Sequence, residues 1–378
     1  MAFLRRTDYP ANRPPRESGD NIFLSLVGIL SLFGLVALLS ASSAKSYIKY
    51  GDSYYIIKHQ LFFLVLGIAF FIIAAKVSYG VWKKNARWML FFSIFLLVLV
   101  FIPGLRGDWG TARSWISIFG FSLQPSEFVK ISFLLYLAAW LEKRKGDLRD
   151  MQKGTLPFIF ILGIIAGLML LQPDFGTLSI IGAGSLIVYF VAGGKIRHII
   201  AIVLIGAVCL FAMLQVKEYQ RNRFKCLIDP GFDTQKICYQ TNQALIAVGS
   251  GGIFGRGLGA SRQKFFYLPE PTGDSIFAII AEEMGFASGL ILVILYSLIF
   301  YRGYKISVNA PDDYGKILGL GLTSWITMQA FINIGGIINL FPMTGVPLPF
   351  VSQGGSAIIS ALGAAGIIYN ISKYSKVR

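Results

Sequence analysis

Histidine and cysteine are scarce in this chain, which contains two histidines and three cysteines among 378 residues. The histidines, His59 and His198, are far apart, and no cluster of cysteine and histidine has the spacing of a zinc site. Cys209 falls within an apolar run, where a small apolar side chain fills space. Cys226 and Cys238 share one polar segment, where a disulfide is chemically allowed but not required. The composition therefore excludes a zinc site built from cysteine and histidine and leaves the disulfide open.

Charged residues are also few, at 14% of the chain, and acids are the rarer kind, with 19 Asp and Glu against 35 Lys and Arg. Apolar residues make up 55%, and the mean hydropathy is +0.64. Apolar runs of about 18 or more residues indicate membrane-spanning helices. We count ten, at roughly 22–42, 56–76, 85–103, 125–141, 155–171, 177–193, 197–215, 275–301, 315–340 and 352–372. The sequence thus predicts an all-α, polytopic membrane protein with about ten transmembrane helices.

The distribution of Lys and Arg predicts the orientation, because short loops rich in these residues stay in the cytoplasm. With the N-terminus inside, the inner loops carry most of the basic residues and the outer loops few. Both termini are then cytoplasmic, and one large extracytoplasmic loop, residues 217–273, lies between the seventh and eighth spans. We expect one transmembrane domain over 21–372, a flexible tail over 1–20 and a short tail over 373–378. No cleavable signal peptide is evident.

The net charge of +16 needs no nucleic-acid partner. The basic residues are spread along the loops without an RNA- or DNA-binding motif, and they suit anionic lipid headgroups.

The large loop is too long for a simple connector, which favours a functional role. Its start, 217–236, is polar and basic, and its middle, 239–249, predicts a short helix at the membrane surface. The glycine-rich run 249–259 lacks the Gly-Lys-Ser/Thr ending of a phosphate loop, so tight turning is favoured, with Arg256 available to a phosphate. Elsewhere, the small-residue pairs Gly163/Gly167 and Gly315/Gly319 favour close helix packing.

Asp274 is the most informative residue, because it ends a polar stretch and precedes an apolar helix. Acids at the mouth of a membrane helix are costly and indicate a functional site. The alternative is that Asp274 caps the helix, where an Asp is favoured anyway. Capping does not explain Glu282 and Glu283, which follow about two turns later.

Three further polar clusters are predicted on the same outer face. In the first, Arg113 precedes Glu127 and Lys130, which lie three apart on one helix face. They form either a self-contained ion pair or, with Arg113, a groove that attracts a phosphate or diphosphate. The second contains Asp174, which either caps the next helix or faces that groove. The third is 347–356, which offers Ser352 and Ser356; Lys264 lies near Asp274 in the sequence.

Five segments together resemble the SEDS family of bacterial shape, elongation, division and sporulation proteins, which includes FtsW and RodA. They are Gln124–Lys130, Gln172–Thr177, Gly257–Glu270, Asp274–Glu283 and Pro349–Ser356. The resemblance runs in order from about residue 22 to 372. Arg262–Lys264 before Leu-Pro-Glu270, and the Pro-Phe-Val-Ser ending, are closer to the division branch, FtsW, than to RodA. The chain departs from the family at Thr272-Gly273 and Ser275, which flank Asp274 where the family usually has His-Thr and Phe, and at Gln353, where it usually has Tyr.

The resemblance implies a ten-helix glycosyltransferase of the cytoplasmic (inner) membrane that polymerises lipid II into peptidoglycan strands at the outer face. It also implies a class B penicillin-binding protein, a transpeptidase, as partner. The essential aspartate of the family falls on Asp274, and its conserved Glu and Lys fall on Glu127 and Lys130.

Such a transfer needs a base for the acceptor hydroxyl and positive charge for the departing diphosphate. We expect Asp274 to be the base, or alternatively to hold a divalent cation, Mg²⁺ or Mn²⁺, which the residues allow but do not demand. Lys130, Arg113, Lys264 and Arg256 are expected to face the diphosphate. Glu282 is expected to raise the pKa of Asp274 by like-charge repulsion.

Two alternatives involve no chemistry. A lipid II flippase would need charged groups along a path through both leaflets, whereas the polar clusters here gather on one face. A scaffold that only recruits the transpeptidase would tolerate loss of Asp274.

Overall fold

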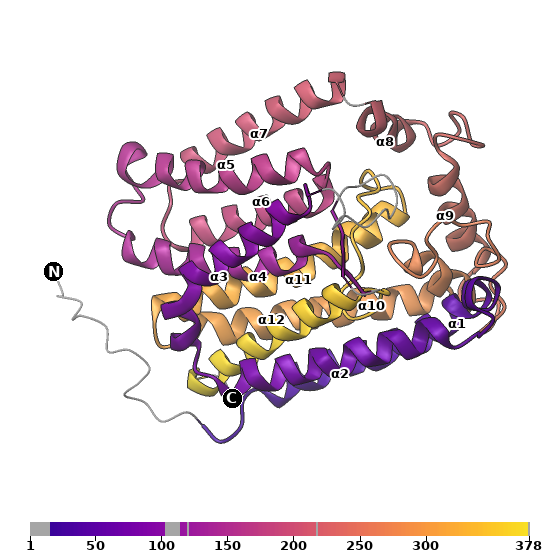
Figure 1. Ribbon diagram of the computed structural model, residues 1–378, viewed down its shortest axis with the longest axis horizontal. Coiled ribbons are helices and arrows are strands. Elements are labelled where there is room, and N and C mark those ends of the chain that lie inside the picture. Colours follow the sequence, from indigo (N-terminus) through magenta and orange to yellow (C-terminus); the bar gives the residue numbers. More distant parts are fainter. Residues whose placement is uncertain (1–15, 103–113, 119–120, 217, 377–378) are drawn as a thin grey trace.

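The computed structural model describes residues 16–102, 114–118, 121–216 and 218–376. These residues form twelve α-helices, one short π-helix and one two-stranded antiparallel hairpin (Figure 1). The helices are α1 (Asn21–Tyr50), α2 (Tyr55–Lys76), α3 (Tyr79–Leu99), α4 (Pro125–Lys143), α5 (Leu156–Leu171), α6 (Phe175–Val191), α7 (Ile196–Val216), α8 (Glu218–Ile228), α9 (Tyr239–Ser250), α10 (Ile276–Val308), α11 (Asp313–Ile337) and α12 (Gly355–Tyr374). The remaining elements are β1 (Ile116–Ile118), β2 (Phe121–Leu123) and the π-helix η2 (Met151–Thr155).

Each of the ten predicted apolar runs lies on a helix, namely α1 to α7 and α10 to α12. Among the described residues, seven helical stretches are long and apolar enough to cross a membrane, and α6 is a shorter apolar helix. The helical class is therefore confirmed. The hairpin of β1 and β2 was not predicted, because three-residue strands carry too little periodicity to be recognised.

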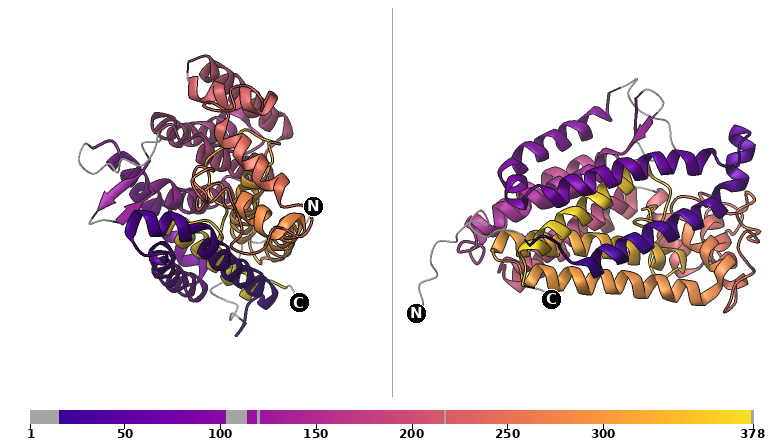
Figure 2. Two further views of the ribbon diagram at one scale, coloured as in Figure 1. Left: turned by 90° about the vertical axis from the view of Figure 1, so that its right-hand side faces the viewer. Right: turned by 90° about the horizontal axis from the view of Figure 1, so that it is seen from below.

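The last two helices form the centre of the bundle. The apolar windows of α11 and α12 are 83% and 78% buried, whereas that of α7 contains no buried residue. In Figure 1, α7 runs along the upper edge of the molecule, and the side views show α10 extending along the bundle beside α1 and α12 (Figure 2). An apolar helix exposed in this way suits a lipid surrounding.

The two ends of the described chain lie side by side, because the backbone N–H of Arg16 donates to the carbonyl of Lys373 at 3.1 Å. They lie at the end of the bundle opposite α8 and α9 (Figure 1). The loops that carry Asp274 belong to the end with α8 and α9, since Asp274 bonds α9 directly.

The large loop contains two helices where one was predicted. The predicted helix over 239–249 is confirmed as α9, whereas α8 was missed because its sequence is polar and basic. Cys226 of α8 and Cys238, just before α9, form a disulfide with 5.4 Å between their Cα atoms. The disulfide that the sequence allowed but did not require is therefore present, and it links the end of α8 to the start of α9.

The glycine-rich run turns tightly against α10 at the point where that helix is broken. Gly285 has a non-helical backbone (φ 74°, ψ −175°), and the N–H groups of Phe286 and Ala287 donate to the carbonyls of Gly252 and Ile253. A Cβ on Gly285 would lie 2.3 Å from the nitrogen of Gly255. The predicted role in tight turning is confirmed, and the run substitutes for the helical bonds that the break removes.

The predicted small-residue packing holds for only one of two pairs. A Cβ on Gly319 would lie 2.4 Å from Ser307 Oγ, and one on Gly315 would lie 2.8 Å from Asp312 Oδ1. Around Gly163 and Gly167 in α5 the space is open, so close packing there is wrong for the described residues.

We expect Gly285→Ala to lower the free energy of unfolding by about 2–5 kcal/mol, because the backbone conformation is confined to glycine and the new methyl group meets backbone atoms. The measurement is thermal unfolding of the purified protein in detergent. Gly167→Ala is the matched control, since its site is open and alanine favours a helix. Equal thermal midpoints for the two variants would contradict the prediction.

Candidate functional site

Asp274 lies in the turn before α10, with its carboxylate bonded to α9 instead of capping α10. The helix begins at Ile276, and Ser275 occupies the N-cap position without a side-chain capping bond. The carboxylate accepts long hydrogen bonds of 3.5 Å from Gln240 Nε2 and from Ser275 Oγ. The capping interpretation of Asp274 is therefore wrong, and a role outside helix capping is favoured.

The surroundings of Asp274 raise its pKa from 3.8 to about 6. Enclosure by protein is the largest cause, because it disfavours the charged form, and the nearby carboxylate of Glu270 adds to it. Arg223 and the hydrogen bond from Gln240 act in the opposite direction. The acid that raises this pKa is thus Glu270, in place of the expected Glu282.

Gly345 leaves room between the acid and the nearby cation. Its φ of +73° is one that side chains rarely adopt, and a Cβ there would lie 3.7 Å from both Arg223 Nη2 and Asp274 Oδ2. Arg223 Nη1 also donates to the carbonyl of Met343 at 2.5 Å. A guanidinium and a carboxylate therefore face the same space beside a bare stretch of backbone.

Asn333 of α11 fixes the backbone that carries Asp274. Its Nδ2 donates to the carbonyls of Asp274 at 2.7 Å and Val346 at 2.8 Å. The predicted residue Ser352 adds a second link, because its Oγ donates to the carbonyl of Gly273 at 2.7 Å. The loops on either side of the acid are thus held together from within the bundle.

The predicted pair Glu127 and Lys130 is buried within the bundle. Lys130 Nζ donates to Glu127 Oε1 and to Gln329 Oε1, each at 2.7 Å, and the two ionic side chains are 1–2% exposed. Ser360 of α12 donates to the second oxygen of Glu127 at 2.8 Å. The ammonium also lies 4.9 Å from the ring centre of Trp325. The self-contained ion-pair interpretation therefore describes this structure.

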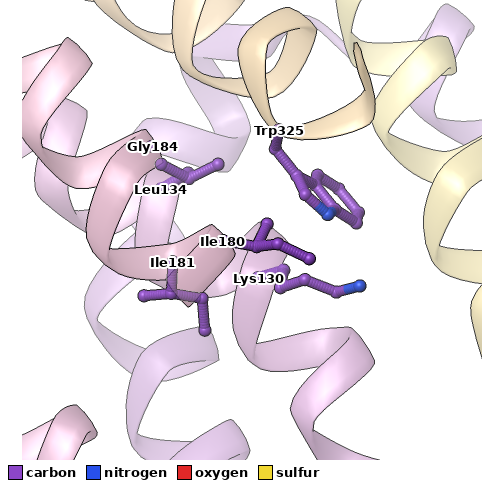
Figure 3. Close-up of a pocket in the computed structure, with 6 residues that line it drawn as sticks. All are labelled: Lys130, Leu134, Ile180, Ile181, Gly184 and Trp325. Atoms are coloured by element: carbon purple, nitrogen blue, oxygen red, sulfur yellow. The ribbon is translucent and has the colours of Figure 1, made fainter. Parts of the chain in front are cut away.

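Apolar side chains from three helices surround the stem of Lys130 (Figure 3). Leu134 belongs to α4, Ile180 and Ile181 to α6, and Trp325 to α11. The space between them has no room for a water-sized molecule. Lys130 therefore positions α4 against α11.

Lys264 and Glu283 form a second buried pair. Lys264 Nζ donates to Glu283 Oε1 at 2.8 Å and to the carbonyl of Gly259 at 2.8 Å, and both side chains are 3% exposed. Ser40 of α1 donates to the same carboxylate at 2.6 Å. The pair fastens the large loop to α1 and α10, which explains why an acid lies so far inside an apolar helix.

Glu282 binds the same loop by a different set of donors. It accepts from Ser261 Oγ at 2.5 Å and from the backbone N–H groups of Arg262 and Gln263. Arg256, whose side chain is 34% exposed, lies 3.7 Å from it. Of the four cations expected to face a diphosphate, Arg256 is the described one with substantial exposure.

The other predicted residues have local roles. Asp174 caps α6 by accepting from the N–H of Thr177 at 3.0 Å, which confirms the capping alternative, and it also accepts from Ser126 Oγ. Ser356 Oγ accepts from the N–H of Gln124 at 3.2 Å. Arg113 lies outside the described residues.

Four residues that contact Asp274 or Lys130 were not predicted from the sequence. Arg223 and Gln240 flank Asp274 from α8 and α9, while Gln329 and Asn333, one turn apart on α11, bond Lys130 and the Asp274 backbone respectively. Arg223 lies in the segment already recognised as basic. The amide residues gave no signal, because a single Gln or Asn in an apolar helix has no periodic pattern.

The described residues contain no group of three or more His, Cys, Asp and Glu side chains that suits a metal ion. Asp274 offers one carboxylate with Glu270 nearby. This donor set fits a cation that is held mainly by substrate phosphates, as Mg²⁺ often is, and does not fit an all-protein cage.

The sequence is similar to one protein family and to individual members of it. The FtsW/RodA/SpoVE family, described as cell cycle proteins, matches residues 20–377. A stage V sporulation protein E of Bacillus subtilis (strain 168) is 37% identical, covering 96% of this chain and 99% of the relative. A probable peptidoglycan glycosyltransferase FtsW of Geobacter sp. (strain M18) is 35% identical, covering 94% of this chain and 97% of the relative.

Solved structures agree with this placement. A chain from a peptidoglycan synthase complex that coordinates polymerization and crosslinking superimposes with a TM-score of 0.78 at 25% identity, covering 94% of this chain and 98% of that one. The rod shape determining protein RodA of Thermus thermophilus superimposes with a TM-score of 0.70 at 25% identity, covering 96% and 99%.

We expect Asp274→Asn to stabilise the protein at about pH 8, by about 1–3 kcal/mol, because a pKa raised above its unfolded value penalises the charged form in the fold. The gain should fade as the pH falls through 6 and vanish only well below the unfolded pKa of 3.8, where the carboxyl is neutral in both states. Thermal midpoints of the two proteins across this range provide the measurement. A destabilised variant at about pH 8 would show that the ionised carboxylate is a structural requirement.

Lys130→Met should destabilise the protein by about 3–5 kcal/mol, since it leaves the buried Glu127 carboxylate without its cation. The double variant Glu127→Gln/Lys130→Met should recover most of that loss, because no uncompensated charge remains. Denaturation midpoints of the single and double variants test the coupling. Additive losses in the double variant would show that the two side chains do not act as a pair.

Proposed function

The chain belongs to the FtsW/RodA/SpoVE family of cell cycle proteins, and from this premise we propose that it is a peptidoglycan glycosyltransferase that polymerises lipid II into glycan strands. The observation that carries the proposal is the space beside Asp274, where a carboxylate with a raised pKa lies next to a guanidinium. A base and a cation side by side are what transfer from a diphosphate-linked sugar needs.

The proposed reaction is an inverting displacement at the anomeric carbon of the growing chain, which is linked to undecaprenyl diphosphate. The 4-hydroxyl of a lipid II N-acetylglucosamine attacks that carbon, and Asp274 accepts the hydroxyl proton. The bond from carbon to the diphosphate oxygen breaks, and its electron pair leaves with the diphosphate. A pKa of about 6 keeps most of the Asp274 carboxyl ionised near neutral pH, as a base requires.

The remaining candidate residues receive supporting roles in this proposal. Lys130 with Glu127, and Lys264 with Glu283, hold the helices and the large loop around the site, because both pairs are buried. Glu282 anchors the same loop. Ser352, Ser356 and Asp174 are assigned to the substrate groove in this proposal. Arg256 and Arg113 are the other cations available to a diphosphate.

A divalent cation, Mg²⁺ or Mn²⁺, is part of the proposal as a substrate-held group. Asp274 would be its one protein ligand, and the cation would add positive charge at the diphosphate.

The proposed topology has ten spans, cytoplasmic termini and an extracytoplasmic loop over 217–273, within a transmembrane domain over 21–372. It is supported by the Lys and Arg distribution, by the adjacent chain ends and by the disulfide in the large loop, since disulfides persist in oxidising compartments. The active site then faces the outside of the cytoplasmic (inner) membrane.

We propose a class B penicillin-binding protein as partner. The structural similarity to a chain from a complex that coordinates polymerization and crosslinking supports this assignment.

The flippase alternative is not favoured, because the relatives are named as glycosyltransferases. The scaffold alternative fails to account for a carboxylate held in an unfavourable ionisation state beside a cation.

The proposal is tested by incubating the purified protein, alone and with its co-expressed partner, with labelled lipid II and Mg²⁺ or Mn²⁺. Moenomycin in the mixture suppresses contaminating classical glycosyltransferases. We expect glycan ladders from the native protein and a loss of about 10²–10⁴-fold in rate for Asp274→Ala.

Asp229→Ala is the matched control, since Asp229 is an exposed acid of the same loop that bonds a local turn. It should retain the native rate. A preparation that contains the partner and moves lipid II across vesicle membranes, but forms no glycan ladder, would contradict the polymerase proposal and favour a transporter.

A further inference from the structure

A cavity of about 210 Å³ lies between α8, α9 and the segment after α11. Its polar lining comes from Arg223 of α8, Gln240 of α9 and Lys236, which precedes α9. The two ionisable groups among the lining residues are both cations, and the amides of Asn222 and Asn339 add further donors. A cavity of this composition is complementary to an anion.

Two residues that line the cavity also lie beside Asp274. Gln240 lines the cavity and donates to Asp274, and Arg223 lines it and faces Asp274 across Gly345. Arg223 is held in place at the wall, because its Nη1 donates to the carbonyl of Met343, which is also a lining residue. Two residues of the anion-complementary lining are therefore also neighbours of the Asp274 carboxylate.

The disulfide fixes the two walls of the cavity relative to each other. Cys226 lines the cavity three residues after Arg223, and its partner Cys238 lies two residues before Gln240. A covalent link at this point holds the cation and the amide on opposite sides of one opening, which reduces the freedom that a ligand would otherwise have to remove.

We infer that this cavity is the subsite for the diphosphate of the lipid-linked sugar donor, with Arg223 and Lys236 as its cations. The inference rests on the proposed glycosyl transfer and adds the residues that receive the leaving group. Arg223 forms charge-assisted hydrogen bonds to the phosphate group nearest the reacting carbon. Lys236 neutralises the second phosphate group.

The position of Arg223 relative to Asp274 suits the separation that the reaction requires between the base and the leaving oxygen. A base reaches the attacking hydroxyl over one hydrogen bond of about 2.6–3.2 Å, and that oxygen approaches the carbon to about 3–3.5 Å. The leaving oxygen then lies roughly 6 Å or more from the base, beyond the carbon. Arg223 lines the cavity and lies beside Asp274 across Gly345, so the electron pair left on the diphosphate oxygen meets positive charge there.

The cations that the sequence suggested are placed less well for this task. The ammonium groups of Lys130 and Lys264 belong to side chains that are 1% and 3% exposed, and each is bonded to a carboxylate. Lys236 is exposed and Arg223 is partly exposed. A diphosphate therefore reaches the second pair from the cavity that both residues line.

The first test measures binding without chemistry. Geranylgeranyl diphosphate and geranylgeraniol are titrated into the purified protein, and the thermal midpoint is recorded. The diphosphate should stabilise the native protein well beyond the alcohol. Lys236→Ala and Arg223→Gln should each weaken diphosphate binding by about 10-fold or more, with geranylgeraniol unaffected.

Lys225→Ala is the matched control, because Lys225 is an exposed lysine of α8 that packs on Phe232 and does not line the cavity. It should bind the diphosphate as the native protein does. Lys236→Arg should retain binding, since the charge stays at the rim. Inorganic pyrophosphate, added in a separate arm, distinguishes recognition of the diphosphate alone from recognition that requires the lipid tail.

The second test is polymerisation of labelled lipid II by the same variants. Lys236→Ala should lower kcat/KM by about 10-fold, and Lys236→Arg should restore it. If the variants bind geranylgeranyl diphosphate like the native protein, or if geranylgeraniol binds as tightly, the subsite is overturned even when the protein polymerises. If diphosphate binding depends on Lys236 but no glycan forms, the proposed subsite is supported and the proposed polymerase activity is contradicted.

Discussion

A charged group inside an apolar helix bundle must be ion-paired and hydrogen-bonded, because burying it unpaired is costly. The buried Lys130 ammonium meets this requirement through partners on several helices. Its partners come from α4 and α11, and Ser360 of α12 completes the carboxylate shell. Gln329, which accepts from Lys130, also donates to the carbonyl of Pro347, and Asn333 one turn later holds Val346 and Asp274. The position of the acid is therefore tied, through one face of α11, to the satisfaction of a buried cation.

Four of the acids singled out in the sequence divide into two kinds by their hydrogen-bond donors. Glu127, Glu282 and Glu283 each receive short hydrogen bonds from side chains or backbone N–H groups, so their charge is compensated within the fold. Asp274 accepts hydrogen bonds of 3.5 Å from Gln240 and Ser275, and its pKa is raised to about 6. This difference in compensation is the physical basis on which we propose Asp274, and none of the three glutamates, as the base.

The sequence predicted what depends on local pattern. The ten apolar helices follow from hydropathy, α9 from its short run of apolar periodicity, and Asp274 from the cost of an acid at a helix mouth. It did not predict contacts that depend on the tertiary fold. Arg223 and Gln240 meet Asp274 from 51 and 34 residues away, and Lys264 pairs with Glu283 instead of facing the site. The basic character of the large loop was visible, but the pairing that decides which cation faces the acid was not.

The disulfide in the large loop also bears on the timing of assembly. It closes a link between α8 and α9, the two helices that carry the neighbours of Asp274. On the proposed topology those thiols meet an oxidant only after the loop has crossed the membrane. On that topology insertion of the bundle comes first and the covalent link between α8 and α9 forms afterwards, so that the outer end of a newly made molecule is completed by thiol oxidation outside the membrane.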